Sequence, residues 1–215
     1  MKVVLVARIA PDAAAGPSGL ALELRDPSTA TTLRRRGAEL VLADGPSAAA
    51  GDPVAGVEEL DVASLEVAVR VAARLAAARV GAIEVRRVDA AGERTTAPDD
   101  RGGGRRYLLL HVLPAEQASD APTDDALLDS TGTPLAATGV VAGSPLLPAA
   151  PGTAATVRVR NGELLVEPGP AAGRTEELAG YDLLHAADLD EAIAVARAHP
   201  TLAAGSIEIR PLVPA

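Results

Sequence analysis

The feature that most constrains the fold of this 215-residue chain is an internal repeat. When the sequence is aligned with itself at an offset of 124, residues 27–86 match residues 151–210 without a gap, and more than a third of these positions are identical. The identities follow structural patterns, such as TTLRRRGAEL over ATVRVRNGEL and GAIEVR over GSIEIR. A repeat of this length is one folding unit, so we predict two related halves.

A segment rich in glycine, charge and small polar residues separates the two copies. Residues 89–104, DAAGERTTAPDDRGGG, have the composition of a flexible linker. We therefore predict a shortened first unit at 1–88, a linker at 89–104 and a full second unit at 105–215. The second copy is longer between its first strand and its hairpin, and this insert, residues 114–142, is predicted to carry a helix that the first copy lacks.

Each copy has the same order of predicted elements. An apolar first strand is followed by a hairpin, a further strand, an amphipathic helix and a last strand rich in β-branched residues. The main elements are first strands at 3–9 and 107–113, hairpin turns at Gly37-Ala38 and Asn161-Gly162, and helices at 64–78 and 188–199. This order predicts an α+β fold in which the helix of each copy covers one face of a sheet.

The core must be aliphatic, because the chain has no Phe or Trp and its only aromatic residues of the Phe, Trp and Tyr class are Tyr107 and Tyr181. It also has no cysteine. This excludes disulfides, thiolate zinc ligands, iron–sulfur clusters and cysteine nucleophiles. No cofactor-binding motif is present, so we predict no cofactor.

The charge balance argues against two classes of partner. The chain has 20 basic and 29 acidic residues, which gives a net charge of −9. Nucleic-acid binding requires a basic surface, and an anionic membrane surface attracts basic segments. No apolar run approaches the roughly 20 residues of a membrane helix, and Arg8 interrupts the N-terminal apolar run early. We predict a soluble cytoplasmic protein that binds neither nucleic acid nor membranes.

The candidate site residues are Tyr107, His111, Tyr181 and His185, which occur as YLLLH and YDLLH on the predicted first and third strands of the second copy. If these strands were parallel neighbours in register, two imidazoles and two phenols would come together. Such a group suits a polar ligand, and imidazole acts as an acid or base near neutral pH. The first copy has Val3, Ala7, Val57 and Asp61 in these places, so the site would occur once per chain.

A structural interpretation of the same residues stands beside this one. Histidines at strand ends and tyrosines at the edge of a core often fill space and keep their polar tips in water. The third histidine, His199, precedes Pro200 on the last turn of a predicted helix. A helix C-terminus favours a cation, so we predict a structural role for His199. We assign no catalytic residue and no metal site.

The second copy resembles YCII-related proteins of the DGPF group, which share a YLLL-type first strand, a TTVRVRDG hairpin, a DGPF motif and a GSVEVRP last strand. The matching segments are RYLLLHV (106–112), ATVRVRNG (155–162), TEELAGY (175–181) and GSIEIRP (205–211). The motif loops retain Asp44, Gly45 and Pro46 in the first copy, and Gly169 and Pro170 in the second. Ser47 stands where the family has Phe, and Pro168 and Ala171 replace the outer residues of the second motif.

The resemblance implies a ferredoxin-like α+β fold whose units pack sheet to sheet as a dimeric α/β barrel. Two copies in one chain would form this arrangement internally, as a pseudo-dimer, in a monomer or a homodimer. Members of the family have been proposed to act as enzymes with a His and an Asp in a cleft, and some are encoded beside or fused to sigma factors.

Three functional hypotheses follow. The first, and the one we favour from sequence, is a module that binds a small molecule or serves as an accessory without catalysis. The second is an enzyme of the isomerase, lyase or hydrolase type that uses His111 and His185. The third is a regulatory partner of a sigma factor, which rests on the family association alone.

Overall fold

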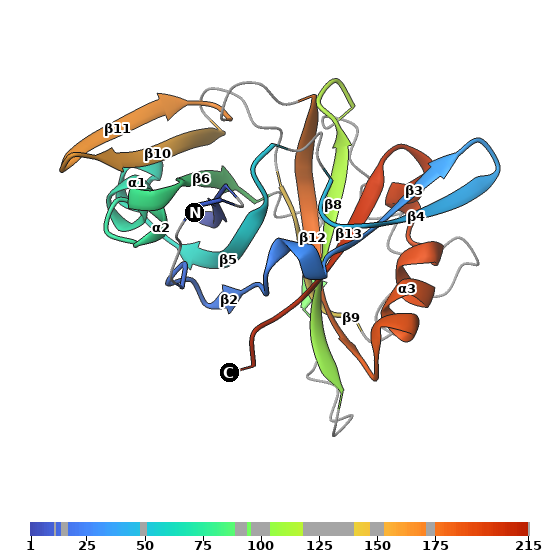
Figure 1. Ribbon diagram of the computed structural model, residues 1–215. Helices are drawn as coiled ribbons and strands as arrows, with labels where there is room; N and C mark the ends of the chain where they lie inside the picture. The colour runs from blue at the N-terminus through green and yellow to red at the C-terminus, as the bar shows by residue number, and fades with distance from the viewer. Residues whose placement is uncertain are drawn as a thin grey trace.

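The computed structural model of the chain describes residues 1–10, 12–13, 17–47, 51–88, 94–95, 104–117, 140–146, 153–170 and 175–214. These residues form two antiparallel sheets, each covered on its outer face by helices (Figure 1). No helix among the described residues is long and apolar enough to cross a membrane.

The first sheet has six strands in the order β11-β10-β6-β1-β5-β2. Its members are β1 (Lys2–Arg8), β2 (Leu22–Glu23), β5 (Val54–Asp61), β6 (Ala82–Arg87), β10 (Ala154–Arg160) and β11 (Glu163–Pro168). The helices on it are α1 (Leu65–Ala72) and α2 (Ala77–Val80). The single helix predicted at 64–78 is therefore two helices, and Ser64 caps the first of them by accepting a hydrogen bond from the amide of Val67.

The second sheet has seven strands in the order β4-β3-β13-β8-β12-β9-β7. Its members are β3 (Thr31–Arg36), β4 (Glu39–Asp44), β7 (Arg94–Thr95), β8 (Arg105–Pro114), β9 (Val140–Pro145), β12 (Glu176–Ala186) and β13 (Ser206–Pro211). One helix, α3 (Leu189–Ala198), and a following 3-10 turn, η6 (Pro200–Ala203), cover its outer face. A further 3-10 turn, η1 (Pro27–Thr29), precedes β3.

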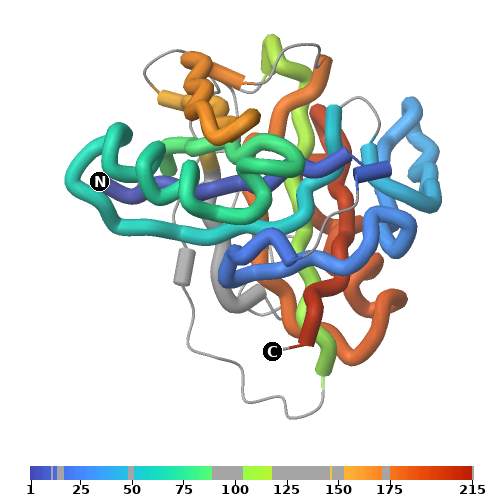
Figure 2. The backbone as a smooth tube through the Cα atoms, turned by 60° about the vertical axis from the view of Figure 1, so that its left-hand side comes forward, coloured from blue at the N-terminus to red at the C-terminus, as the bar shows by residue number. Residues whose placement is uncertain are grey.

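The two halves exchange their hairpins. The hairpin β10–β11 of the second half pairs with β6 of the first half, and the hairpin β3–β4 of the first half pairs with β13 of the second (Figures 1 and 2). Both pairings have the same register at the offset of 124, since Val157 lies opposite Ile83 and Leu33 lies opposite Ile207. Leu33 and Val157 are each fully buried in the core of the other half.

Three hydrophobic cores follow from this arrangement. One lies between the first sheet and α1 and α2, and one lies between the second sheet and α3. The third joins the two sheets and includes Val4 and Val57 from one half and Leu108, Leu110 and Tyr181 from the other. Burial of apolar area at about 25 cal/mol per Å² is the main term that holds such layers together.

Buried ion pairs also lie between the sheets. The guanidinium of Arg86 on β6 donates to Glu177 on β12 over 2.7 Å, and both side chains are almost fully buried. At the matching place in the second half, Arg210 contacts Glu208 over 3.0 Å and donates to the carbonyl of Val54 on the first sheet over 2.9 Å. A buried charge without such a partner is strongly unfavourable, so these contacts fix which faces of the sheets meet.

The hairpin turns have the backbone that the sequence predicts. Asn161 and Gly162 both have positive φ, at 54° and 82°. In the Gly37-Ala38 turn of the first half, only Gly37 has a positive φ, at 62°. The motif loops close the hairpins at their other end, where Gly45 and Gly169 each have positive φ and each accept a hydrogen bond from the threonine hydroxyl of the paired strand.

The α+β class is confirmed, and the strand order β13-β8-β12-β9 agrees with the ferredoxin-like plan. Neither sheet closes on itself among the described strands, so the barrel remains a prediction. The predicted insert helix within 114–142 and most of the linker at 89–104 lie outside the described residues. The described part of that linker includes the short strand β7 at the edge of the second sheet.

Two glycines 124 residues apart sit against a backbone carbonyl at the start of the last strand of each half. A Cβ at Gly81 would lie 2.1 Å from the carbonyl oxygen of Arg8, and one at Gly205 would lie 2.1 Å from that of Val112. We expect Gly81→Ala and Gly205→Ala each to lower the free energy of unfolding by about 1–3 kcal/mol. Gly104→Ala is the control: a Cβ there would lie 3.0 Å from its closest atom, the carbonyl oxygen of Ala186, so the loss of stability should be smaller. Urea unfolding followed by circular dichroism measures the difference, and equal stabilities would contradict the expectation.

Candidate functional site

Two histidines and one aspartate meet on the α3 face of the second sheet. The Nε2 atom of His111 lies 3.2 Å from Oδ2 of Asp182, and the Nε2 atom of His199 lies 3.1 Å from the same oxygen. The two imidazole rings are tilted by 39°, with centroids 4.3 Å apart. All three residues are buried, Asp182 completely. We refer to His111, Asp182 and His199 as the His–Asp–His cluster.

Strand pairing places two members of the cluster. Asp182 on β12 lies opposite Leu109 of β8, and His111 lies opposite Gly180. Side chains two residues apart on a strand share a face, so Leu109, His111 and Asp182 all point to α3. A register shift between Leu178 and Gly180 lies directly beside this point, and such irregularities re-aim side chains next to functional sites.

The chain reversal after α3 places the third member. His199 ends α3 and begins η6, and its Nδ1 accepts a hydrogen bond from the amide of Thr201 over 3.2 Å. An imidazole nitrogen that accepts a backbone N–H carries no proton. Nε2 of His199 is therefore the ring nitrogen that donates a hydrogen bond to Asp182.

The two imidazoles keep Asp182 ionised. Burial opposes ionisation and by itself raises the pKa of this carboxyl group, but the charge and hydrogen bond of His111 and the hydrogen bond of His199 outweigh it. The pKa of Asp182 is therefore held well below its usual range. The result is a buried carboxylate whose oxygen orients the His111 ring.

The cluster also has the donor types of a metal centre. Its nitrogen and oxygen atoms all lie within 4.8 Å of one another, and two histidines with one carboxylate form a known ligand set for divalent transition metals. A ligating histidine normally donates a hydrogen bond from its other ring nitrogen. Because Nδ1 of His199 instead accepts one from Thr201, its Nε2 keeps the proton and presents no lone pair to an ion. The arrangement suits a hydrogen-bonded acid–base group better than a metal.

The structure separates the four residues that the sequence grouped. The prediction of parallel strands was wrong, because β8 and β12 are antiparallel neighbours. His111 therefore lies opposite Gly180, while His185 lies opposite Arg106 at the other end of the pair. The third strand of a ferredoxin-like unit turns back after the second, so it runs against the first strand.

The two tyrosines lie on opposite faces of the second sheet. Tyr107 is in the core under α3, whereas Tyr181 is in the core between the sheets and donates a hydrogen bond to Glu59 over 2.5 Å. His185 is half-buried and lies outside the His–Asp–His cluster. Of the four predicted residues, only His111 belongs to the His–Asp–His cluster.

The motif loops have a structural role in the described part of the chain. Gly45 and Gly169 each donate a backbone hydrogen bond across the base of their hairpin, to Ala30 and Ala154 respectively. Beside Asp44, Gly45 and Pro46, the buried Ser47 donates from its hydroxyl to Glu176 over 2.8 Å and from its amide to Glu208 over 3.0 Å. The first motif loop thus attaches one half to the other.

Sequence reasoning missed Asp182 and assigned His199 only a structural role. A signal for Asp182 was present, since it occupies an inward position in the apolar strand LAGYDLLHA, where an acid is costly without a partner. For His199 the signal was its place directly before a proline, which turns the chain back over the sheet. Neither signal identifies the partner without the strand pairing.

The fold and the cluster together define a class of protein, an α+β domain with a buried His–Asp–His cluster beneath its helix. Residues 107–215 match the sequence model of the YCII-related domain. This is half of the chain, and the chain belongs to the YCII-related family. A search of curated proteins found no match.

The role of Asp182 predicts a dependence of stability on pH. A carboxyl with a lowered pKa in the folded state stabilises the protein above its unfolded pKa of about 3.9, and this contribution is lost as pH falls through the lower folded value. We expect Asp182→Asn to cost about 2–3 kcal/mol of unfolding free energy at neutral pH, and the difference from the unsubstituted protein to shrink only below about pH 4.

Urea unfolding between pH 2 and pH 8 measures this effect. Asp190→Asn is the matched control, because Asp190 is exposed on the first turn of α3. A cost at neutral pH that is equal for the two variants would contradict the assignment of a stabilising carboxylate at Asp182.

Proposed function

We propose that the second half of the chain is an enzyme that transfers a proton on a small substrate, with His111 as the acid–base group. The observation that carries this proposal is the contact of one carboxylate oxygen of Asp182 with both imidazoles. Without cysteine or a cofactor motif, acid–base chemistry is the chemistry that these residues supply. The reaction class is that of an isomerase, a lyase or a hydrolase.

Each member of the cluster has a distinct role in this proposal. Asp182 holds the Nε2–H of His111 and stabilises the imidazolium that forms when the ring accepts a proton, as a carboxylate does for histidine in hydrolytic triads. His199 donates to the same oxygen and keeps the carboxylate in place. Asp182 and His199 are positioning residues, and His111 is the residue that exchanges a proton with the substrate.

We also propose that the two halves form an internal pseudo-dimer. Its support is the reciprocal exchange of hairpins in one register, with Leu33 opposite Ile207 and Val157 opposite Ile83. The first half has Ala7, Glu58 and Leu75 at the places that correspond to the cluster. The pseudo-dimer would therefore hold one acid–base centre, with the first half as its scaffold.

Binding of a small molecule without catalysis, which we favoured from sequence, gives way to this proposal because of the ionised Asp182 between two imidazoles. Association with a sigma factor and a cytoplasmic location stay predictions. A pull-down with purified sigma factor tests the first of these.

A proton-exchange screen tests the enzyme proposal. The full chain is incubated in D₂O with a panel of small carbonyl acids, and deuterium incorporation at the carbon next to each carbonyl is followed by ¹H NMR. We expect catalysed exchange with at least one compound, reduced by His111→Gln by about 10²–10⁴-fold. Asp182→Asn should lower the rate and change its pH profile.

His185→Gln is the matched control, since His185 lies on the same strand as Asp182 but outside the cluster. It should exchange at the unsubstituted rate. No exchange with any compound, or equal losses in the His111 and His185 variants, would overturn the proposal.

A further inference from the structure

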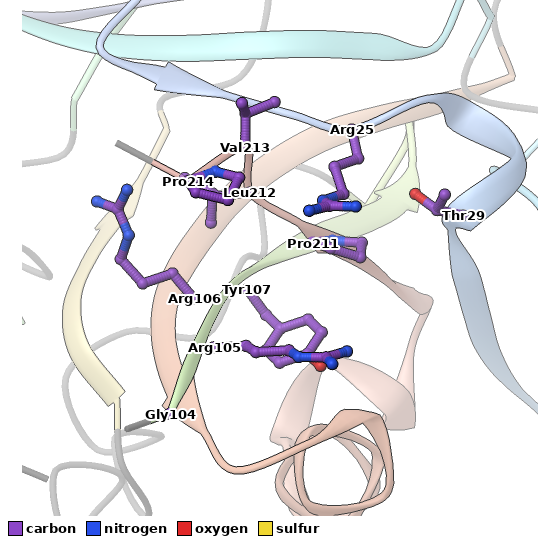
Figure 3. Close-up of a pocket in the computed structure, with 10 residues that line it drawn as sticks. All are labelled: Arg25, Thr29, Gly104, Arg105, Arg106, Tyr107, Pro211, Leu212, Val213 and Pro214. Carbon is purple, nitrogen blue, oxygen red and sulfur yellow. The ribbon is translucent and has the colours of Figure 1, made fainter. Parts of the chain in front are cut away.

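A cavity of about 660 Å³ opens at the junction of the two halves, away from the His–Asp–His cluster. Arg25 and Thr29 reach it from the first half, and Arg105 and Tyr107 reach it from β8 of the second half. The C-terminal segment 211–214 forms the wall between them (Figure 3). Its volume is within the range of small-molecule sites.

The charge of this cavity is opposite to that of the protein. Its ten lining residues include three arginines and no aspartate or glutamate, although the chain carries a net charge of −9. A neighbouring cavity of about 620 Å³ shares Arg25 but is also lined by Glu23 and Asp26. Of these two neighbouring cavities, only the first has arginines and no carboxylate in its lining.

The arginines of the cavity differ from the buried arginines of the protein. Arg86 and Arg210 are fully buried and each contacts a carboxylate. Within the part of the chain that the structure describes, Arg25, Arg105 and Arg106 form no ion pair. In Figure 3, the guanidinium of Arg25 reaches toward β8, and the side chain of Arg105 extends beside the Tyr107 ring, whereas Arg106 points to the other side of the C-terminal segment.

The tyrosine adds a second kind of group to the cavity. Tyr107 is only 2% exposed, yet it lines the cavity, and its hydroxyl makes no hydrogen bond with a described residue. This oxygen is not one of the buried polar atoms that lack a partner, so it is open to water or to a ligand in the cavity. The ring of Tyr107 together with Pro211 and Leu212 supplies apolar surface next to the guanidinium of Arg105.

Backbone hydrogen bonds hold the walls in place. The amide of Arg25 donates to the carbonyl of Pro211 over 3.0 Å, the amide of Leu212 donates to Arg106 over 3.0 Å, and the amide of Val213 donates to Glu23 over 2.9 Å. Three segments distant in sequence are thereby joined around one opening. A ligand would meet arginines whose backbone positions are already set, which lowers the entropic cost of binding.

We propose that this cavity is a binding site for a small organic anion, whose carboxylate or phosphate group is held by Arg25 and Arg105 and whose apolar body packs on Tyr107 and Pro211. Guanidinium groups pair with both kinds of anion through charge-assisted hydrogen bonds. The Tyr107 hydroxyl donates a further hydrogen bond to the anion. This site is independent of the acid–base centre proposed above.

The site is tested by titrating the full chain with benzoate, phenyl phosphate and inorganic phosphate. Binding is measured from ¹H–¹⁵N spectra that include the arginine Nε–Hε groups. We expect saturable binding of benzoate or phenyl phosphate, and the one that binds more tightly shows whether the site prefers a carboxylate or a phosphate. Inorganic phosphate should bind more weakly, because it lacks the apolar body. The double variant Arg25→Gln/Arg105→Gln should weaken binding at least about tenfold. Tyr107→Phe should weaken it less.

The matched control is Arg35→Gln/Arg36→Gln, which removes the same charge from two exposed positions on β3. It should bind as the unsubstituted chain does. Absence of saturable binding of either aromatic anion, or equal weakening in the two double variants, would overturn the proposal. The second outcome would show that only the overall charge of the protein matters.

Discussion

The structure depends on the antiparallel pairing of each hairpin with the last strand of the other half. A hairpin alone is at best marginally stable in water, and here each becomes the edge of a sheet to which it is not joined in sequence. The pairing of β3 with β13 holds β13 in place, and β13 is the neighbour of β8, the strand that carries His111. The position of the candidate acid–base centre thus depends on residues of the half that has no such centre.

Corresponding strands of the two halves pair in the same register but carry different side-chain chemistry. Ala7 and Gly56 are paired in the first sheet as His111 and Gly180 are in the second. An alanine in place of His111 and a leucine in place of His199 make the first-half position an apolar core. The counterpart of Asp182 in the first half is Glu58, which is only partly buried. The fully buried Asp182 is tolerated because two imidazoles contact it.

Sequence periodicity and the repeat were sufficient to predict the fold class and most elements. The turn at Asn161-Gly162 and the helix α3 followed from local signals, because turn chemistry and capping act over a few residues. The site could not be predicted in the same way. Its geometry depends on whether β8 and β12 are parallel or antiparallel, and reversal of one strand moves His185 to the far end of the pair.

The exchange of hairpins also has a consequence for the order in which the chain folds. During synthesis the first half emerges before β10, so the edge of β6 has no partner strand until residues 154–160 have been made. Contacts between residues so far apart in sequence form slowly, because the intervening chain must be ordered first. An open strand edge is where other chains add during that interval. The first half is therefore the one most exposed to misassembly while the protein is being made.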